Sequence, residues 1–420
     1  MTEEVASRTR FGWVRLASVF LAGQAVVQLT NVVAGLMIVR LLPVDQYALY
    51  TVAATLLALL ALAANPGISQ AVITQGARFA EDRSVIAGLV GAASSMSRRL
   101  YLAMLPILVV VAAAMLVPHD WPLAATAAVV FLAAAMVWMR VPTMIATAVL
   151  NLRHDSRGLF LVGIGEGLVR VALVPLCFLW PHAVIALVAG LAGAGLARWI
   201  GQRRISPLID KAAAPMPGQA AEIRRFIRPL APIVVYTALQ GQIAVLILSL
   251  LGNTGSIASV GAITRLGQII SIGMLLNPFL IQPIMARQVD RDGFRARVGL
   301  IVAGLSGIST ALMASAFVVP GWWLWILGGS YAGLERELPV ALATALLTLV
   351  GGTLYTLVIS RNRTAGQYWP ILPSIAGQAL FVAFHGVSGT LDALVLGLIP
   401  AFAYAVVQGM LLGRVVGEWR

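Results

Sequence analysis

The chain has 420 residues, of which 60% are hydrophobic and only 11% charged, and its mean hydropathy is +0.92. This composition excludes a soluble globular protein, in which about a quarter of the residues are charged. At about 20 residues per bilayer crossing, the chain has room for about a dozen spanning helices and little else. We predict an all-α polytopic membrane protein.

The basic character of the chain does not indicate a nucleic-acid partner. Its net charge is +13, but the basic residues punctuate apolar runs and do not gather on one predicted face, as nucleic-acid binding requires. Only Lys211 is a lysine, a bias that we interpret as bacterial coding. The single cysteine, Cys177, lies in an apolar run, so neither a disulfide nor a thiolate metal site is expected. We predict no cofactor.

Twelve apolar segments are long enough to be transmembrane spans. The first follows Arg8, Arg10 and Arg15 and is too long for the apolar region of a signal peptide, so we interpret it as a span. The predicted spans cover residues 17–39, 46–66, 100–117, 121–141, 158–179, 182–199, 229–251, 258–285, 298–319, 339–360, 368–387 and 391–413.

The distribution of basic residues predicts the orientation of these spans. With both termini inside, and with Arg140 and Arg198 at span ends counted with the adjoining connections, 25 of the 29 basic residues fall on the cytoplasmic side, whereas only Arg40 and Arg336 fall on the other. Arg170 and Arg265 fall inside spans. Because an excess of Lys and Arg marks cytoplasmic connections, we predict a multi-pass protein of the bacterial inner membrane with both termini in the cytoplasm.

The longest cytoplasmic connection divides the chain into two predicted six-helix lobes, residues 1–200 and 229–420. The linker, residues 201–228, contains an arginine-rich stretch that we interpret as an amphipathic helix resting on anionic lipid. The lobes share the pattern N-P-x-x-x-Q, beginning at Asn65 and Asn277. We therefore predict a duplicated unit, with the lobes related as parallel repeats by a pseudo-two-fold axis.

Nucleotide and metal motifs are missing from the sequence. It contains neither G-x-x-x-x-G-K-[ST] nor H-E-x-x-H. The glycines Gly163, Gly165 and Gly167 lie inside a predicted span without the spacing of a dinucleotide site, and we interpret them as close helix packing. Any transport is therefore expected to be secondary, and an enzymatic function is not predicted.

Glu166 and Arg170 are the most informative charged residues. They lie four residues apart, hence on one helix face, near the middle of the span at 158–179. Each costs about 2.5–3.5 kcal/mol at this depth if alone. One interpretation is a structural intrahelical ion pair; the other is a cavity in which Glu166 binds a proton or coupling cation and Arg170 an anion.

Polar residues in three other spans are candidate substrate contacts. Arg265 shares its span with Gln268, which favours a cavity wall over snorkelling to the interface, although snorkelling stays open. The remaining candidates are uncharged and could equally form interhelical hydrogen bonds. They are Gln24, Gln28 and Asn31, which form one stripe in the first span, and Gln240.

Several segments resemble a known family. Residues 40–50, Arg-Leu-Leu-Pro-Val-Asp-Gln-Tyr-Ala-Leu-Tyr, are similar to the turn between the first two helices of bacterial polysaccharide flippases, although Leu42 and Ala48 replace its two glycines. These flippases belong to the multidrug/oligosaccharidyl-lipid/polysaccharide exporter superfamily. Weaker similarities lie at residues 66–71, 262–266 and 326–331.

This resemblance to O-antigen-type flippases implies a twelve-helix, two-lobe transporter. Its substrate would be a polyprenyl-pyrophosphate-linked oligosaccharide, moved from the cytoplasmic to the periplasmic leaflet by alternating access during lipopolysaccharide or other polysaccharide biosynthesis. Arg265, Arg40 and Arg170 would form the cationic cavity. The implied partners are this substrate, membrane lipid, a coupling cation or proton and polysaccharide assembly proteins.

Two alternatives remain. Cation-coupled drug or small-molecule antiporters of the same superfamily rank second, because they rely on a carboxylate in the first helix and none is found in the first span here. A membrane polysaccharide polymerase or ligase ranks third, since it would need catalytic residues on a sizeable outer loop. The longest outer segment, residues 320–338, contains only Glu335, Arg336 and Glu337 as charged residues.

Overall fold

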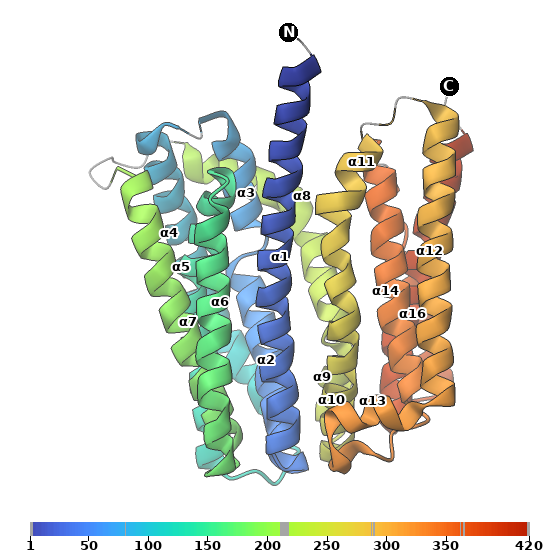
Figure 1. Ribbon diagram of the computed structural model, residues 1–420. Coiled ribbons are helices and arrows are strands. Elements are labelled where there is room, and N and C mark those ends of the chain that lie inside the picture. The colour runs from blue at the N-terminus through green and yellow to red at the C-terminus, as the bar shows by residue number, and fades with distance from the viewer. Residues whose placement is uncertain are drawn as a thin grey trace. The chain divides into compact units, whose positions relative to one another are not determined.

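Figure 1 shows a computed structural model, which describes residues 3–79, 81–210, 218–286, 288, 290–361, 363 and 366–417. These residues form helices and connecting turns and contain no strand. The prediction of an all-α protein is confirmed. The physical reason is that a membrane-spanning chain satisfies its backbone hydrogen bonds most simply within helices.

The chain divides into two compact units, and both boundaries fall inside helices. One boundary lies at Val32 in α1 (Glu3–Leu41) and the other at Gly261 in α10 (Thr254–Ser271). The first unit comprises the residues up to Val32 and from Ala262 onward, and the second comprises Val33–Gly261. These units differ from the predicted lobes 1–200 and 229–420 with their linker at 201–228. The predicted division rests on the duplicated pattern in the sequence and stays a prediction.

The second unit contains the following elements between α1 and α10: α2 (Val44–Ala64), α3 (Ile68–Gly76), the 3₁₀ turn η1 (Ala77–Phe79), α4 (Arg83–Leu116), α5 (Leu123–Leu152), α6 (Ser156–Leu173), η2 (Val174–Phe178), α7 (Ala183–Ile205), η3 (Ser206–Leu208), α8 (Gln219–Gln240) and α9 (Ile243–Leu250). The helix α7 packs against α5 and α6. These three helices carry the charged residues discussed below.

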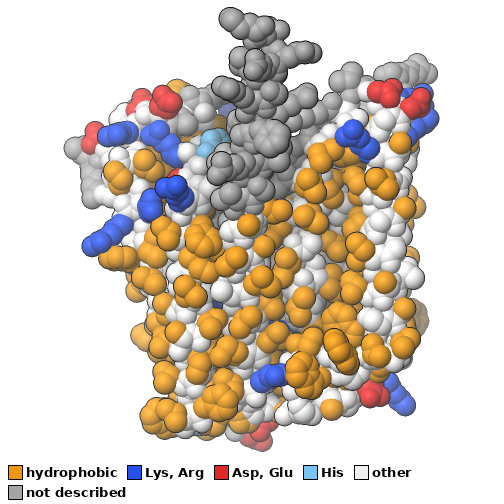
Figure 2. All heavy atoms as spheres, viewed as in Figure 1, with side chains coloured by type: hydrophobic (Ala, Val, Ile, Leu, Met, Phe, Trp, Pro, Cys, Tyr) orange, Lys and Arg blue, Asp and Glu red, His pale blue; other side chains and the backbone are white. Residues whose placement is uncertain are grey.

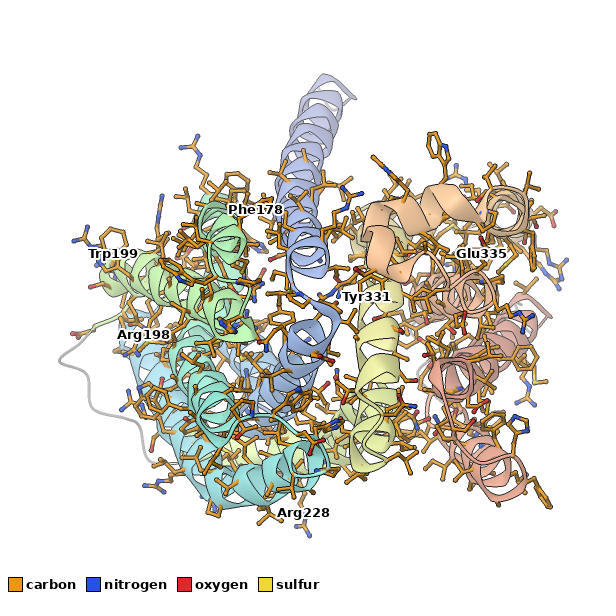
Figure 3. The ribbon with its side chains drawn as sticks, turned by 90° about the horizontal axis from the view of Figure 1, so that it is seen from below. Phe178, Arg198, Trp199, Arg228, Tyr331 and Glu335 are labelled. Atoms are coloured by element: carbon orange, nitrogen blue, oxygen red, sulfur yellow. The ribbon has the colours of Figure 1, made fainter. Side chains whose placement is uncertain are left out.

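The first unit contains, after α10, the 3₁₀ turn η4 (Ile272–Leu275), the π-helical turn η5 (Asn277–Ile281), α11 (Gln282–Ala286), α12 (Arg291–Val318), α13 (Pro320–Leu327), η6 (Gly329–Tyr331), α14 (Leu338–Ile359), α15 (Ile371–Phe384) and α16 (Thr390–Gly417). Its core lies between α12, α14 and α16, around Phe294, Leu357 and Leu412. Tyr331 and Glu335, labelled in Figure 3, lie in the connection from α13 to α14.

Eleven helices of the described chain are long and apolar enough to cross a bilayer, as expected of a multi-pass membrane protein. The expected span at 368–387 corresponds to α15, which has only 14 residues. On the face that Figure 2 shows, hydrophobic side chains cover the flanks of the helices and basic side chains lie mainly near helix ends. This pattern suits a surface in contact with lipid.

The helices α4 and α5 extend well beyond the predicted spans. The span expected at 100–117 belongs to α4, which begins at Arg83, and the span expected at 121–141 belongs to α5, which continues to Leu152. Arg98 and Arg99, which precede the predicted span, therefore lie inside a helix, and Arg140, near the end of its predicted span, lies well inside α5. A hydropathy profile marks only the apolar part of a helix, whereas helical hydrogen bonding continues to the next turn signal.

The arginine-rich stretch of the predicted linker begins α8, and its apolar side packs against protein. Ile223 and Ile227 are buried in the core of the second unit together with Ile68 and Val149. Arg224 and Arg228 are exposed on the other side of the helix. The prediction of an amphipathic helix is confirmed, and its apolar side completes the core of the unit. The contact of its basic side with anionic lipid stays a prediction.

The two N-P-x-x-x-Q segments have different local structures. Asn65 ends α2, where its side chain donates to Ser69 Oγ at 2.7 Å and accepts from the Ser69 amide at 3.0 Å, and Gly67 has a positive φ of 91°. Asn277 instead begins the π-helical turn η5, which continues into α11 without a break. The shared pattern therefore closes a helix break in one place and widens a helix in the other.

Candidate functional site

An ion pair between α5 and α6 lies in the interior of the second unit's helices. Arg140 Nη2 of α5 donates to Glu166 Oε1 of α6, and the exposed fractions of the two side chains are 24% and 21%. Glu166 lies roughly 15 Å along α6 from Ser156, at 1.5 Å per residue, which is about half the thickness of a hydrocarbon core. The pair is therefore placed at mid-depth.

The chain connectivity explains why Arg140 meets Glu166. The helices α5 and α6 are consecutive and are joined by a short connection at residues 153–155. Helices joined in this way run antiparallel, so residues at equal distances from the connection lie side by side. Arg140 lies about as many residues before the connection as Glu166 lies after it. Sequence reasoning missed this partner, although the equal spacing was a usable signal.

Arg170 lies one turn beyond Glu166 on α6 and is partly buried. Within the described residues it forms no salt bridge, so the predicted Glu166–Arg170 ion pair is not present. Its position is determined by glycines of α7. A Cβ at Gly190 would lie 3.6 Å from Arg170 Nη2, and a Cβ at Gly193 would lie 2.8 Å from the Glu166 carbonyl oxygen.

Close approach of α6 and α7 through glycines is a general feature of this packing. A Cβ at Gly165 would lie 2.8 Å from Ile200 Cδ1, and Gly167 is buried. The interpretation as helix packing is therefore supported at Gly165, where a small residue allows the close approach that is common in membrane helices.

The charges of this cluster sum to a positive excess. Arg140 and Arg170 provide two cations, whereas Glu166 is the single carboxylate among them. Arg140 Nε is buried and has no hydrogen-bond partner in the described part of the chain. We name Arg140, Glu166 and Arg170 the charged cluster. It offers a carboxylate, a guanidinium donor without a described partner and a second cation, about midway along α6.

Arg265 and Gln268 form a polar face on α10 in the first unit. Arg265 Nη1 donates to Gln268 Oε1 at 3.2 Å, and the Ser271 hydroxyl donates to the Gln268 carbonyl oxygen at 2.7 Å. Gln268 is exposed and Arg265 half-buried. Asn277, further along the chain, is buried and accepts a hydrogen bond from Thr353 of α14 at 3.0 Å, so it belongs to the packing and not to this face.

The polar stripe of the first span lies on α1 within the first unit. Gln28 is exposed, while Gln24 and Asn31 are half-buried. None of these three side chains hydrogen-bonds to another described residue, so the interhelical hydrogen bonds that we considered are not observed there. The stripe therefore presents free donors and acceptors.

The last two candidates are located at helix ends of the second unit. Arg40 lies in the last turn of α1 and is exposed, a position in which a cation interacts favourably with the helix dipole. Gln240 is the final residue of α8 and is half-buried. The structure thus brings Glu166 close to Arg170 and Arg265 close to Gln268, and places these two pairs in different units.

Comparisons with known proteins identify the fold. No protein-family model matches the chain, and neither does any curated protein. Among solved structures, the chain is similar to an inward-facing multidrug resistance MATE family transporter of the MOP superfamily, with a TM-score of 0.60, 16% identity, and coverage of 94% of this chain and 98% of the other.

Two further structures show the same similarity. One is the eukaryotic MATE transporter AtDTX14, with a TM-score of 0.62, 14% identity, and 98% and 96% of the two chains covered. The other is a MOP superfamily transporter from Pyrococcus furiosus, described as having a binding pocket of reverse polarity that suggests a different function, with a TM-score of 0.58, 14% identity, and 96% and 95% covered. The chain therefore has a MATE-like transporter fold.

Proposed function

We propose that the protein is a secondary transporter that works by alternating access. The observation that carries this proposal is the near full-length MATE-like fold with a charged cluster at mid-depth in its helices. Ionisable residues at this depth are costly and are characteristic of substrate and ion pathways. The same fold argues for a transporter over a polymerase or ligase.

The charged cluster supports coupling to a cation or proton at Glu166. Its carboxylate is about one fifth exposed and is already paired with Arg140. A proton or cation that binds Glu166 weakens its attraction to this guanidinium, so binding is linked to the contact between α5 and α6. Such a linkage is what a coupled transporter requires, because a ligand shifts a conformational equilibrium only through differential affinity.

Cation-coupled export of a drug or small molecule is the substrate class that the structural neighbours favour. Multidrug transporters are among them, and the similarity extends over almost the whole chain. In this proposal Gln24, Gln28 and Asn31 supply uncharged polar contacts, since their side chains hydrogen-bond to no other described residue.

The flipping of a polyprenyl-pyrophosphate-linked oligosaccharide is the second candidate, and the charge balance favours it. Arg140 and Arg170 outnumber Glu166, and Arg265 adds a further cation on α10. A pyrophosphate that enters a low-dielectric cavity needs fixed positive charge, and arginine provides a bidentate donor fork. In this proposal the protein resides in a bacterial inner membrane and operates with polysaccharide assembly proteins.

Two assays on the same proteoliposomes separate the candidates. In the first, an imposed sodium or proton gradient drives efflux of a cationic dye; in the second, a reagent added outside quenches a fluorescent lipid-linked sugar as it reaches the outer leaflet. An antiporter is active in the first assay only, and a flippase in the second only. Inactivity of folded, correctly inserted protein in both assays, with several dyes and lipid-linked sugars, would contradict the transporter proposal.

A further inference from the structure

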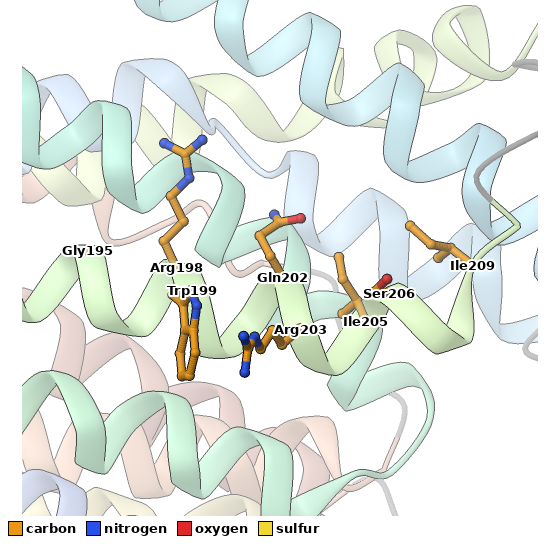
Figure 4. Close-up of a pocket in the computed structure, with 8 residues that line it drawn as sticks. All are labelled: Gly195, Arg198, Trp199, Gln202, Arg203, Ile205, Ser206 and Ile209. Atoms are coloured by element: carbon orange, nitrogen blue, oxygen red, sulfur yellow. The ribbon is translucent and has the colours of Figure 1, made fainter.

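An open pocket of about 520 Å³ runs along the C-terminal half of α7 and the turn that follows it (Figure 4). It lies within the second unit and contains neither Glu166 nor Arg170. Side chains from one helix and its following turn line it, namely Gly195, Arg198, Trp199, Gln202, Arg203, Ile205, Ser206 and Ile209. Gly195 contributes to the opening, because a Cβ there would meet no atom within 4 Å.

Two guanidinium groups give the pocket its charge. Within the part of the chain that the structure describes, neither Arg198 nor Arg203 forms a salt bridge. Arg198 Nη1 contacts Met139 Sδ at 3.3 Å, and a thioether is only a weak acceptor. The guanidinium carbon of Arg203 lies 4.1 Å from the centroid of the Trp199 ring. This stacking orients the group while leaving its edge donors available.

The pocket lies at the depth where lipid headgroups begin. Counted from Ala183 at 1.5 Å per residue, Arg198 is roughly 22 Å and Arg203 roughly 30 Å along α7, and a hydrocarbon core is about 30 Å thick. Trp199 is 52% exposed, and tryptophan is typical of the membrane interface. Figure 3 shows Trp199 near the periphery of the helices. A ligand of this pocket is therefore met from the lipid side.

We propose that this pocket binds the headgroup of an anionic phospholipid such as phosphatidylglycerol. Arg203 binds the phosphate through charge-assisted hydrogen bonds, and Arg198, which Figure 4 shows on the opposite side of α7, adds positive charge at the same pocket. Gln202 and Ser206 offer the polar groups that a glycerol headgroup requires, and Ile209 provides an apolar wall for the adjoining acyl chain. Basic pockets at helix ends are suited to such headgroups. This inference is independent of what the protein transports.

The test uses purified full-length protein in nonionic detergent, titrated with phosphatidylglycerol or with zwitterionic phosphatidylcholine while bound lipid is counted by native mass spectrometry. We expect phosphatidylglycerol to bind preferentially. In Arg198→Gln/Arg203→Gln its affinity should fall at least about tenfold, which corresponds to about 1.4 kcal/mol. Equal binding of the two lipids to the unmodified protein would overturn the proposal.

The matched control is Arg98→Gln/Arg99→Gln. These two arginines are exposed and lie in the same unit, inside α4, but they do not line the pocket. Their replacement removes the same charge as the replacement of Arg198 and Arg203. The control should bind phosphatidylglycerol as the unmodified protein does. If both double variants lose affinity equally, the effect is one of net charge and the pocket is not the site.

A soluble anion distinguishes the two sources of phosphate. Inorganic phosphate at millimolar concentration should not displace the lipid, because it lacks the acyl chain that places the headgroup at this depth. Full displacement would show a general anion site and would contradict the lipid assignment. If the double variant does not fold, the exposed Arg203→Gln variant replaces it, with an expected fall in affinity of about fivefold; unchanged affinity would overturn the proposal.

Discussion

Glu166 of α6 pairs with Arg140 of α5 and not with Arg170 on its own helix. The pairing connects two helices that are consecutive in the chain, so a change in the charge of the carboxylate affects the contact between both helices. Because the side chains are about one fifth exposed, the pair retains access to a proton or small cation. This relationship makes the charged cluster testable through each of its members.

Neutralising Glu166 should remove coupling. We expect Glu166→Gln to lower gradient-driven transport at least tenfold in proteoliposomes, because glutamine neither titrates nor binds a cation as a carboxylate does. Arg140→Gln serves as the matched control, since it breaks the same ion pair but keeps the carboxylate. Transport by Glu166→Gln that still follows the imposed gradient would refute a coupling role.

The stability of the same variants should reveal the ion pair directly. Each single replacement leaves one charge without its partner and should destabilise the protein by less than the 3–5 kcal/mol typical of a fully buried pair, because this pair is partly exposed. The double replacement Arg140→Met/Glu166→Leu should recover most of that loss. Chemical unfolding of all four proteins gives the coupling energy, and additive losses would show that the residues do not interact.

Arg265 should discriminate between the two substrate classes. If it binds pyrophosphate, flipping of the lipid-linked sugar should decrease in the order unmodified protein, Arg265→Lys, Arg265→Ala, since lysine cannot form the two parallel hydrogen bonds of a guanidinium. A snorkelling arginine would tolerate lysine fully and alanine nearly so. Unimpaired flipping by a normally inserted Arg265→Ala protein would eliminate Arg265 as the essential ligand.

The close contact between α6 and α7 should be sensitive to a single methyl group. Gly193→Ala would place a Cβ 2.8 Å from the Glu166 carbonyl oxygen, so the helices must separate, and we expect a loss of about 1–3 kcal/mol. Gly195→Ala on the same helix meets no atom within 4 Å and should be neutral or stabilising. Thermal unfolding in detergent compares the two. Equal stability would show that α7 can shift without cost.

Stability at acidic pH should depend on His119. This side chain is 6% exposed, its Nδ1 lies 2.6 Å from Thr254 Oγ1, and its ring stacks on Trp121. Burial lowers the pKa of His119 below its usual value of 6.5, because the charged imidazolium is desolvated. The unfolded chain therefore binds the proton more readily, and stability should fall as the pH decreases below about 6.5.

A histidine replacement isolates this effect. We expect His119→Gln to flatten the pH dependence of the unfolding temperature between pH 8 and pH 5, whereas replacement of the exposed His182 by glutamine should leave it unchanged. An identical slope in the His119→Gln variant and the unmodified protein would assign the acid sensitivity to other groups.

The predicted orientation can be checked by cysteine labelling. Ala220, an exposed residue at the start of α8, and Ser330, an exposed residue in η6, would each be replaced by cysteine after Cys177→Ala, which removes the buried native thiol. An impermeant maleimide added to intact cells should label position 330 and not position 220. Labelling of position 220 alone would show that the orientation is opposite to the predicted one.

The sequence alone indicated the eleven described helices that are long and apolar enough to cross a bilayer, because this property depends on local composition and length. The twelfth predicted span, 368–387, forms the shorter helix α15. It also identified Glu166, Arg170 and Arg265 as unusual, since a charge inside an apolar run is visible without a fold. The resemblance of residues 40–50 led to the superfamily in which the structural neighbours are found.

Only the tertiary structure decided which residues meet. Glu166 pairs with Arg140 and not with Arg170, because antiparallel packing of α5 and α6 brings the guanidinium of the neighbouring helix to the carboxylate. Ile223 and Ile227 lie in the core of their unit, where neighbouring helices supply apolar surface that a hydropathy profile cannot locate. The N-P-x-x-x-Q segments likewise differ in their partners, since Asn65 accepts a hydrogen bond from Ser69 of α3 and Asn277 accepts one from Thr353 of α14. Helix formation is local, whereas the partners of a polar side chain depend on which helices pack together.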